Sequence, residues 1–163
     1  MSALTIDSGS AERTARLGAL LGRLLAPGDV VALAGDLGAG KTVFAKGVAA
    51  GLGLAREEVR SPTFILAARH EGGRVPLVHV DAYRLEGPEA LAELGLDEIL
   101  DPAAAALIEW APRVAAVLPR DRLEVAIDHA GATRRRLAFG AGGDRSAALL
   151  ARFRQAFESG ETE

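Results

Sequence analysis

Leucines recur along the first part of the chain at the spacing of an amphipathic helix. They fall at i, i+3, i+4, i+7 and i+8: Leu17, Leu20, Leu21, Leu24 and Leu25. This spacing places them on one stripe of a helix. Ser10 is a favoured N-cap residue, and Pro27-Gly28 is a stop signal. The pattern therefore predicts a helix from a Ser10 cap to about Leu25.

A continuous apolar run follows and leads into a glycine-rich segment. Val30–Ala34 contains no polar residue, as in a strand that is buried on both faces. Gly35–Thr42 comes next, and Gly53 is a fitting stop for a helix after it. Between them, apolar side chains return at i, i+4 and i+8: Phe44, Val48 and Leu52. The predicted local order is strand, glycine loop, helix.

Two segments on either side of Gly72-Gly73 predict a hairpin. They are Phe64–His70 and Val75–Asp81. Pro76 has no N–H for a sheet ladder, so we expect its strand to lie at an edge or to carry a bulge. The earlier Ser61-Pro62-Thr63 should be extended or turned, because a residue before proline avoids the helical region.

The rest of the pattern predicts two strands between two helices. Pro88–Leu94 is typical of a short helix. Ala104–Trp110 suits a helix or a buried strand, and we favour the strand because the run is short and follows Asp101-Pro102. Alternation with polar neighbours predicts a half-buried strand at Leu123, Val125 and Ile127. A final amphipathic helix is outlined by Leu149, Leu150, Phe153 and Phe157.

Together these elements predict an α/β fold. The chain has 163 residues, of which 49% are hydrophobic and 25% charged, and this is enough for one core. We expect a single domain over residues 1–163, with the last few residues disordered. Its central sheet should be mixed and mainly parallel, flanked by helices, with antiparallel hairpin additions.

Composition narrows the possible functions. A net charge of −3 argues against a protein that coats nucleic acid. The absence of cysteine excludes disulfides, thiolate metal sites and a cysteine nucleophile. The first apolar run is interrupted by Gly18, Gly22 and Arg23, so it is not a signal peptide, and no run reaches the roughly 18 apolar residues that span a bilayer. We therefore expect a cytoplasmic protein with no membrane contact.

The glycine loop carries the clearest chemical signal. Gly35-x-x-x-x-Gly40-Lys41-Thr42 satisfies the P-loop pattern, in which backbone N–H groups surround a phosphate at the N-terminus of a helix. Lys41 can reach the outer phosphates, and the Thr42 hydroxyl is a hard oxygen ligand for Mg²⁺. Lys46 is the only other lysine among 19 basic residues, so a lysine here favours chemistry that arginine serves less well.

Two acids follow apolar strands and are candidates for the metal and the attacking water. Asp81 follows Leu77–Val80, and Glu109 follows Ala106–Ile108. Parallel strands would end near the phosphate loop, so one acid can hold the metal while the other orients or deprotonates water. The alternative is that either is only a solvated acid at a strand end.

The nucleotide base can be narrowed by exclusion. P-loop GTPases usually recognise guanine through an Asn/Thr-Lys-x-Asp motif. This chain has no asparagine, and neither Lys41 nor Lys46 is followed two residues later by aspartate. A conventional GTPase is therefore excluded, and ATP is favoured.

Four motifs in this order make the chain resemble the TsaE family, from about Ser10 to Arg136. They are Gly35–Thr42, Ser61-Pro62-Thr63-Phe64, His79–Leu85 and Ile108-Glu109-Trp110. That family comprises small bacterial ATPases needed for the threonylcarbamoyladenosine modification of tRNA. The resemblance implies a P-loop fold that uses ATP and Mg²⁺ and works with a TsaB–TsaD complex, with tRNA engaged only indirectly.

The resemblance also implies residue roles. The phosphates would be held by Asp36, Leu37, Gly38, Ala39, Gly40, Lys41 and Thr42. Thr42 and Glu109 would serve the metal, Asp81 would be the catalytic aspartate, and Thr63 falls at a switch-like threonine. A backbone position near Ala11 and a late arginine, for which we choose Arg134, would complete the nucleotide site. Val43 stands where the family often has a second hydroxyl, so that contact is lost.

Other residues receive structural interpretations. The histidines show no ligand spacing, and His79 is interpreted as packing in a strand rather than facing the site. Arg134-Arg135-Arg136 is interpreted as a solvated strand with one useful member rather than a tRNA-facing patch. Tyr83 and Arg84 can face a partner or brace Asp81 equally well.

Two alternatives to an ATPase that serves a partner enzyme are kept open. A small-molecule kinase is compatible with the fold, but no arginine-rich lid segment lies between the predicted hairpin and the strand that ends at Trp110, where Arg84 is the only arginine. A nucleotide-gated interaction module would bind ATP with little hydrolysis. Turnover with and without TsaB–TsaD distinguishes the module from the ATPase.

Overall fold

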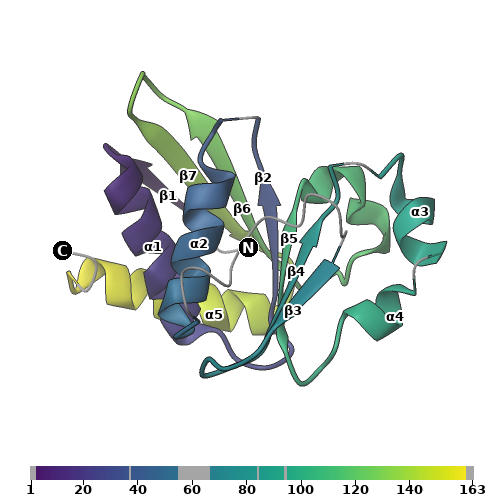
Figure 1. The fold of residues 1–163 in the computed structure, drawn as a ribbon. Helices are drawn as coiled ribbons and strands as arrows, with labels where there is room; N and C mark the ends of the chain where they lie inside the picture. The colour runs from purple at the N-terminus through teal and green to yellow at the C-terminus, as the bar shows by residue number, and fades with distance from the viewer. Residues whose placement is uncertain (1–2, 37, 55–66, 84, 94, 161–163) are drawn as a thin grey trace.

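Seven strands form one sheet with helices on both faces (Figure 1). The computed structural model describes residues 3–36, 38–54, 67–83, 85–93 and 95–160. The strand order is β1-β7-β6-β2-β5-β4-β3. The strands are β1 (Ala3–Ser8), β2 (Val30–Ala34), β3 (Ala67–His70), β4 (Leu77–Asp81), β5 (Ala105–Glu109), β6 (Leu123–His129) and β7 (Arg135–Ala141).

The four central strands run parallel to one another. Strand β2 pairs in parallel with β5 and β6, and β5 pairs in parallel with β4. The outer strands β1, β7 and β3 pair antiparallel with their neighbours. This arrangement confirms the predicted mixed sheet with a mainly parallel core, and the β3–β4 hairpin is the predicted one. Parallel strands place their carboxyl ends at one edge of the sheet, where β2, β4 and β5 lead into loops.

The expectation for Pro76 was wrong. Its strand, β4, lies inside the sheet between β3 and β5. Pro76 immediately precedes the first strand residue, Leu77, so its missing N–H removes no bond from within the strand. Its carbonyl still accepts a hydrogen bond from the Ala105 N–H at 2.9 Å.

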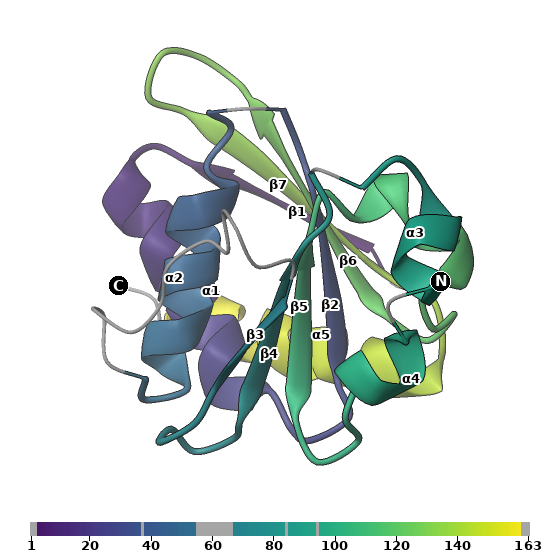
Figure 2. The ribbon, with the colours of Figure 1, turned by 45° about the vertical axis from the view of Figure 1, so that its right-hand side comes forward.

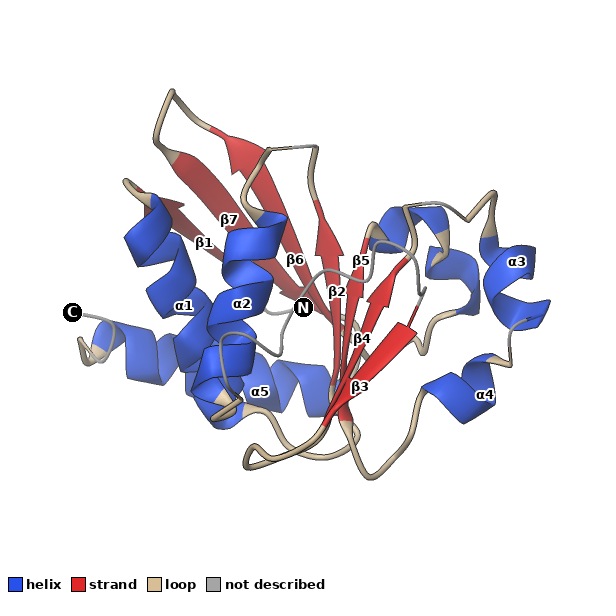
Figure 3. Ribbon diagram, in the orientation of Figure 1, coloured by secondary structure: helices blue, strands red, loops and turns tan. Residues whose placement is uncertain are grey.

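The helices divide between the two faces of the sheet (Figures 2 and 3). They are α1 (Ala11–Leu24), α2 (Lys41–Gly51), α3 (Pro88–Glu93), α4 (Leu96–Ile99) and α5 (Asp144–Glu158), with 3₁₀ turns η1 (Ala111–Arg113) and η2 (Ala115–Val117). Leucines of α1 and α5 pack with Val31 and Leu33 on one face. Leu91 of α3 packs with Val30 and Ala32 on the other. Alternate residues of β2 thus enter two separate cores.

The predicted helix and strand starts are largely confirmed. Ser10 caps α1, and its Oγ accepts a hydrogen bond from the Arg13 N–H at 3.1 Å. The favoured strand reading of Ala104–Trp110 is correct, because β5 covers Ala105–Glu109. Edge strand β1 was not predicted. None of the helices in the described ranges is long and apolar enough to pass through a bilayer.

Glycines allow α1 and α2 to pack in direct backbone contact. A Cβ on Gly22 would lie 2.1 Å from the Val48 carbonyl oxygen, and a Cβ on Gly47 would lie 2.2 Å from that of Ala15. Both distances are far below van der Waals contact, so only glycine fits at these crossings. The close approach fixes the P-loop helix α2 against α1.

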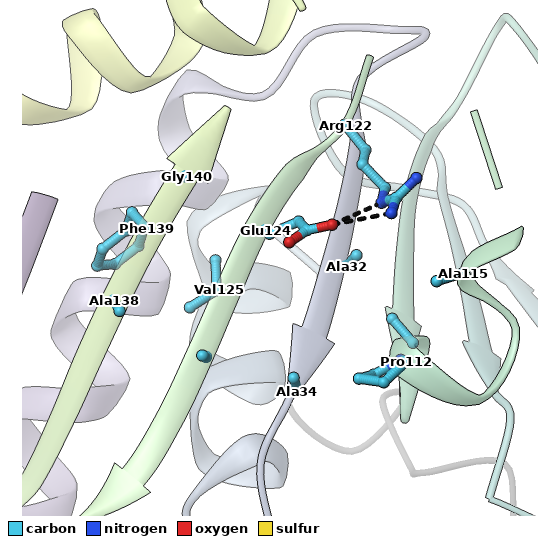
Figure 4. Close-up of a pocket in the computed structure, with 12 residues that line it drawn as sticks. Ala32, Ala34, Pro112, Ala115, Arg122, Glu124, Val125, Ala138, Phe139 and Gly140 are labelled. Atoms are coloured by element: carbon cyan, nitrogen blue, oxygen red, sulfur yellow. Dashed lines mark hydrogen bonds and ion pairs between the residues drawn. The ribbon is translucent and has the colours of Figure 1, made fainter. Parts of the chain in front are cut away.

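A cavity of about 480 Å³ lies on the face of the sheet that carries α3, beside β6 and β7 (Figure 4). Small side chains such as Ala32, Ala34 and Ala138 line it, with Pro112 of η1 on one side. Arg122 and Glu124 at its margin form an ion pair at 2.9 Å. The cavity does not include the P-loop lysine, so we place the candidate chemistry elsewhere.

Candidate functional site

The P-loop connects the carboxyl end of β2 to the N-terminus of α2. Gly38 and Gly40 have φ values of +79° and +106°, which are left-handed conformations that favour glycine. A Cβ on Gly35 would lie 2.4 Å from the Ile127 carbonyl oxygen of β6. The loop can therefore turn tightly beside the sheet. It leaves the free N–H groups at the start of the eleven-residue helix α2 directed toward the loop.

Lys41 is held across the start of this loop. Its Nζ donates hydrogen bonds to the carbonyl oxygen of Gly35 and, at 2.8 Å, to that of Asp36. These bonds take two of the three donors of an ammonium group. Burial lowers the pKa of Lys41, while the nearby Glu109, Asp36 and Asp81 carboxylates act in the opposite direction. The residue is only 6% exposed, so its charge lies in the floor of the site.

Asp81 and Glu109 end neighbouring parallel strands and pair in register. Both line a cavity of about 330 Å³ together with Gly38, Gly40, Lys41 and Thr42. Burial raises the pKa of the Asp81 carboxyl, and this outweighs the hydrogen bond that it accepts from the Tyr83 N–H at 3.0 Å. The two predicted acids therefore meet beside the predicted phosphate loop.

His79 contacts Glu109 beneath this cavity. The distance from His79 Nε2 to Glu109 Oε2 is 2.6 Å, and the residues are 1% and 3% exposed. The contact joins residues thirty positions apart and was not predicted. Its sequence signal was the polar histidine inside the apolar run of β4, two positions before Asp81, so that both side chains face α2.

Aromatic rings form one wall of the site. Trp110 has φ +58° and is the only non-glycine residue with positive φ in the described part of the chain. Its ring centroid lies 3.9 Å from Lys41 Nζ and 4.9 Å from the Tyr83 ring. Tyr83 is 43% exposed, and its ring lies 5.6 Å from the Arg113 guanidinium carbon. This wall shields the lysine from solvent on one side.

The residues around the cavity fit a magnesium ion that is bound together with phosphates. Thr42 is exposed into the cavity and offers a hydroxyl, while Asp81 and Glu109 offer carboxylates. Such hard oxygen donors suit Mg²⁺. Across the described ranges no cluster of three or more His, Cys, Asp or Glu forms a protein-only metal site. The remaining ligands would be phosphate oxygens and waters, which Mg²⁺ commonly keeps.

The other residues predicted to contact the nucleotide differ in how they lie relative to the P-loop. Asp36 lines an adjacent cavity with Trp110, whereas Ala39 is buried. Ala11 is the exposed first residue of α1, whose Thr14 would lie 3.9 Å from a Cβ on Gly40. The start of α1 is therefore next to the loop. The predictions for Leu37, Thr63 and Arg84, and for disorder at the last three residues, fall outside the described residues.

Of the three consecutive arginines, Arg135 contacts the loop. Its Nη2 donates a hydrogen bond to the Gly38 carbonyl oxygen at 3.2 Å. Arg136 instead pairs with Asp7 of β1 at 3.0 Å. Arg134, which the sequence reasoning preferred, is exposed in the turn before β7, and its nucleotide contact stays a prediction. The positions of these three consecutive arginines in the sequence did not indicate which of them reaches the loop.

Sequence comparison places these motifs in a known family. The family model described as threonylcarbamoyl adenosine biosynthesis protein TsaE matches residues 8–137. A tRNA threonylcarbamoyladenosine biosynthesis protein TsaE from Bacillus subtilis is 43% identical over 134 residues, which cover 82% of this chain and 83% of that protein. The protein of that name from Treponema pallidum is 46% identical over 120 residues, covering 74% and 87%.

Structural comparison agrees with the sequence matches. The crystal structure of Bacillus subtilis YdiB superposes with a TM-score of 0.80 at 35% sequence identity. The superposition covers 94% of this chain and 95% of the other. The resemblance in fold therefore extends over nearly the whole of both chains.

Proposed function

This chain belongs to the TsaE family, and from that membership and the geometry of the site we propose that it is a Mg²⁺-dependent ATPase of tRNA threonylcarbamoyladenosine modification. The observation that carries the proposal is the single cavity into which Lys41, Thr42, Asp81 and Glu109 all open. It combines an anion-binding loop, a cation-binding hydroxyl and two acids, which are the parts needed for phosphoryl transfer to water.

Binding of the triphosphate is assigned to the loop and its lysine. The phosphates are assigned to the free N–H groups of the loop and of the N-terminus of α2, and Lys41 supplies a localised positive charge. The bonds from Lys41 to Gly35 and Asp36 hold this charge in place before ATP arrives. Thr42 and Glu109 would hold the magnesium ion, which when bound neutralises charge on the outer phosphates.

Hydrolysis is assigned to Asp81. Its raised pKa and its place opposite the loop suit a group that orients the attacking water and accepts its proton. The hydrogen bond from the Tyr83 N–H occupies Oδ1, which leaves Oδ2 to face the water. Water attacks the γ-phosphorus, the bond to the bridging oxygen breaks, and ADP and phosphate leave.

The remaining assignments concern the base, the partner and the compartment. Contact with the nucleoside is assigned to the backbone at Ala11, which begins α1, and to Arg134 just before β7. The contact between Arg135 and Gly38 makes Arg135 a second candidate beside Arg134. TsaB–TsaD would stimulate turnover, with Thr63 part of the switch, while tRNA is engaged only through that complex. A role on tRNA favours the cytoplasm.

The proposal is tested by ATP turnover with TsaB–TsaD and no added acceptor. Asp81→Ala and Glu109→Ala should each lower the rate by about a hundredfold or more, the usual cost of a lost transition-state contact. Asp144→Ala is the matched control, because Asp144 is exposed in the first turn of α5 and lines neither the Lys41 cavity nor the adjacent cavity with Asp36. If both site variants hydrolyse ATP like the parent chain, the assignment is wrong. Transfer of phosphate to a metabolite instead of water would favour a kinase.

A further inference from the structure

The two acids of the site are oriented by different means. Asp81 accepts a hydrogen bond from the backbone N–H of Tyr83, two residues further along its own chain segment. Glu109 has no such turn. In the described part of the chain, the Glu109 side chain instead contacts the side chain of His79.

The sheet brings His79 to this position. His79 pairs with Leu107 in the parallel β4–β5 ladder, and Asp81 pairs with Glu109. The imidazole is therefore attached two residues earlier in the ladder than Glu109. The Glu109 side chain reaches back along β5, toward β4, to contact it. At 1% and 3% exposure, neither residue is well placed to exchange this partner for bulk water.

The histidine is costly to bury for packing alone. Among the described residues its Nδ1 has no hydrogen-bond partner, although the atom is fully buried. An aliphatic side chain would fill the same volume without an unpaired polar atom. Within the described ranges, the polar interaction of His79 that offsets this cost is its side-chain contact with Glu109 at 2.6 Å.

We propose that His79 is a positioning residue that fixes the Glu109 carboxylate for the nucleotide site. In this arrangement the imidazole carries its proton on Nε2 and donates it to Oε2, since a carboxylate oxygen accepts hydrogen bonds. This leaves Oε1 available to the cavity that Glu109 lines. The inference rests on the proposed function for its consequence in catalysis, but the contact itself belongs to the nucleotide-free protein.

A spectroscopic experiment tests the contact without any nucleotide. In the ¹⁵N-labelled parent chain, the ring signals of His79 should show a protonated Nε2 and a bare Nδ1. Glu109→Ala should shift these signals, while Asp144→Ala, in the exposed first turn of α5, should leave them unchanged. A His79 ring that is bare at Nε2, or that does not respond to Glu109→Ala, would overturn the proposal.

Two substitutions of His79 separate positioning from packing. His79→Gln places an amide N–H near the former Nε2, whereas His79→Asn is too short to reach Glu109. His79→Asn should lower kcat with TsaB–TsaD by about 10- to 100-fold, with little change in KM for ATP, as is typical when a residue that orients a metal-site ligand is lost. His79→Gln should recover most of that loss.

The possible failures are distinguishable. A parent chain that does not hydrolyse ATP with TsaB–TsaD refutes the proposed function, while the ring signals still decide the contact. Normal parent turnover, with equal rates for His79→Asn and His79→Gln, refutes the positioning role. If His79→Asn does not fold, His79→Gln and the spectra remain, and a kcat for His79→Gln below one-hundredth of the parent value would count against the proposal.

Discussion

Two half-buried aspartates at opposite ends of the parallel strands have opposite electrostatic environments. Asp121, near the amino end of β6, accepts three hydrogen bonds from Ser146 and the Arg145 N–H, and these lower the pKa of its carboxyl. Asp81, at the carboxyl end of β4, accepts one from the Tyr83 N–H, and burial raises its pKa. The carboxylate of Asp121 is held by several hydrogen bonds and stabilises the fold. The carboxylate of Asp81 has fewer hydrogen bonds and is available for chemistry.

Buried charges follow the same division. Asp29, just before β2, is 3% exposed, and both of its oxygens are used: one by Arg145 Nε at 2.6 Å and one by the Ala26 N–H at 2.8 Å. Beyond the carboxyl end of β2, Lys41 uses two of its three donors and keeps the third. The amino end is thus built for stability, and the carboxyl end keeps polar atoms for a ligand.

The largest effect that tests this division is expected at Lys41. Lys41→Met should reduce ATP turnover with TsaB–TsaD by about a hundredfold or more, because a preorganised charge at the phosphates is lost. The melting temperature should not fall, since burial already disfavours the ammonium and lowers its pKa. Lys46→Met, at an exposed position of the same helix, is the control and should change neither quantity. A large loss of stability in Lys41→Met would contradict the comparison.

The converse effect is expected at Asp29. Asp29→Ala should lower the free energy of unfolding by about 2 kcal/mol, because it removes hydrogen bonds to a buried charged group. Binding of MgATP to the folded protein should be unchanged. Urea unfolding and calorimetry measure the two quantities. Asp144→Ala, exposed in the first turn of α5, should cost less than about 1 kcal/mol. If Asp29→Ala weakens nucleotide binding more than tenfold, the two ends are not independent.

The smallest expected effect is the pH dependence of the free energy of unfolding that Asp121 and Asp81 contribute in the absence of nucleotide and metal. The two contributions should change with pH in opposite directions. Because the folded-state pKa of Asp121 is lowered from 3.8, its stabilisation is present above that value and is lost as pH falls through the lowered pKa. The folded-state pKa of Asp81 is raised, so the fold favours its protonated form, and that contribution is lost as pH rises through the raised pKa.

Unfolding of two variants at several pH values measures these signs. Asp121→Asn should be less stable than the parent at neutral pH, and the difference should shrink on acidification. Asp81→Asn should be at least as stable as the parent at neutral pH, and any advantage should shrink as pH falls below the raised pKa. Differences that change with pH in the same direction for both variants would remove the basis of the comparison.

Much of the central sheet could be predicted from the sequence because apolar runs and glycines are local signals. Val30–Ala34, the P-loop and the following helix were all found in this way. Strand β1 was missed because it is a six-residue edge strand in which only Ile6 and Ser8 are buried. The expectation for Pro76 was wrong because a proline just before the first residue of a strand removes no hydrogen bond from the ladder. This holds for an internal strand as well as for an edge strand.

The site was predictable in its parts but not in its contacts. Lys41, Asp81 and Glu109 were identified by motif and strand end, yet the bond from His79 to Glu109 depends on the register of β4 against β5. The choice among the arginines depends likewise on which way β7 leaves its turn, and Arg135 is the one that reaches Gly38. Periodicity gives the face on which a residue lies, whereas tertiary pairing decides its partner.

Titration calorimetry of the purified chain with MgATP tests the central claim most directly, namely that the loop from Gly35 to Thr42 binds the phosphates. The account predicts saturable binding to the parent, comparable binding to Lys46→Met, and binding weakened by more than tenfold in Lys41→Met. Absence of binding heat together with an unchanged melting temperature in the parent, or equal affinities for the parent and Lys41→Met, would contradict it.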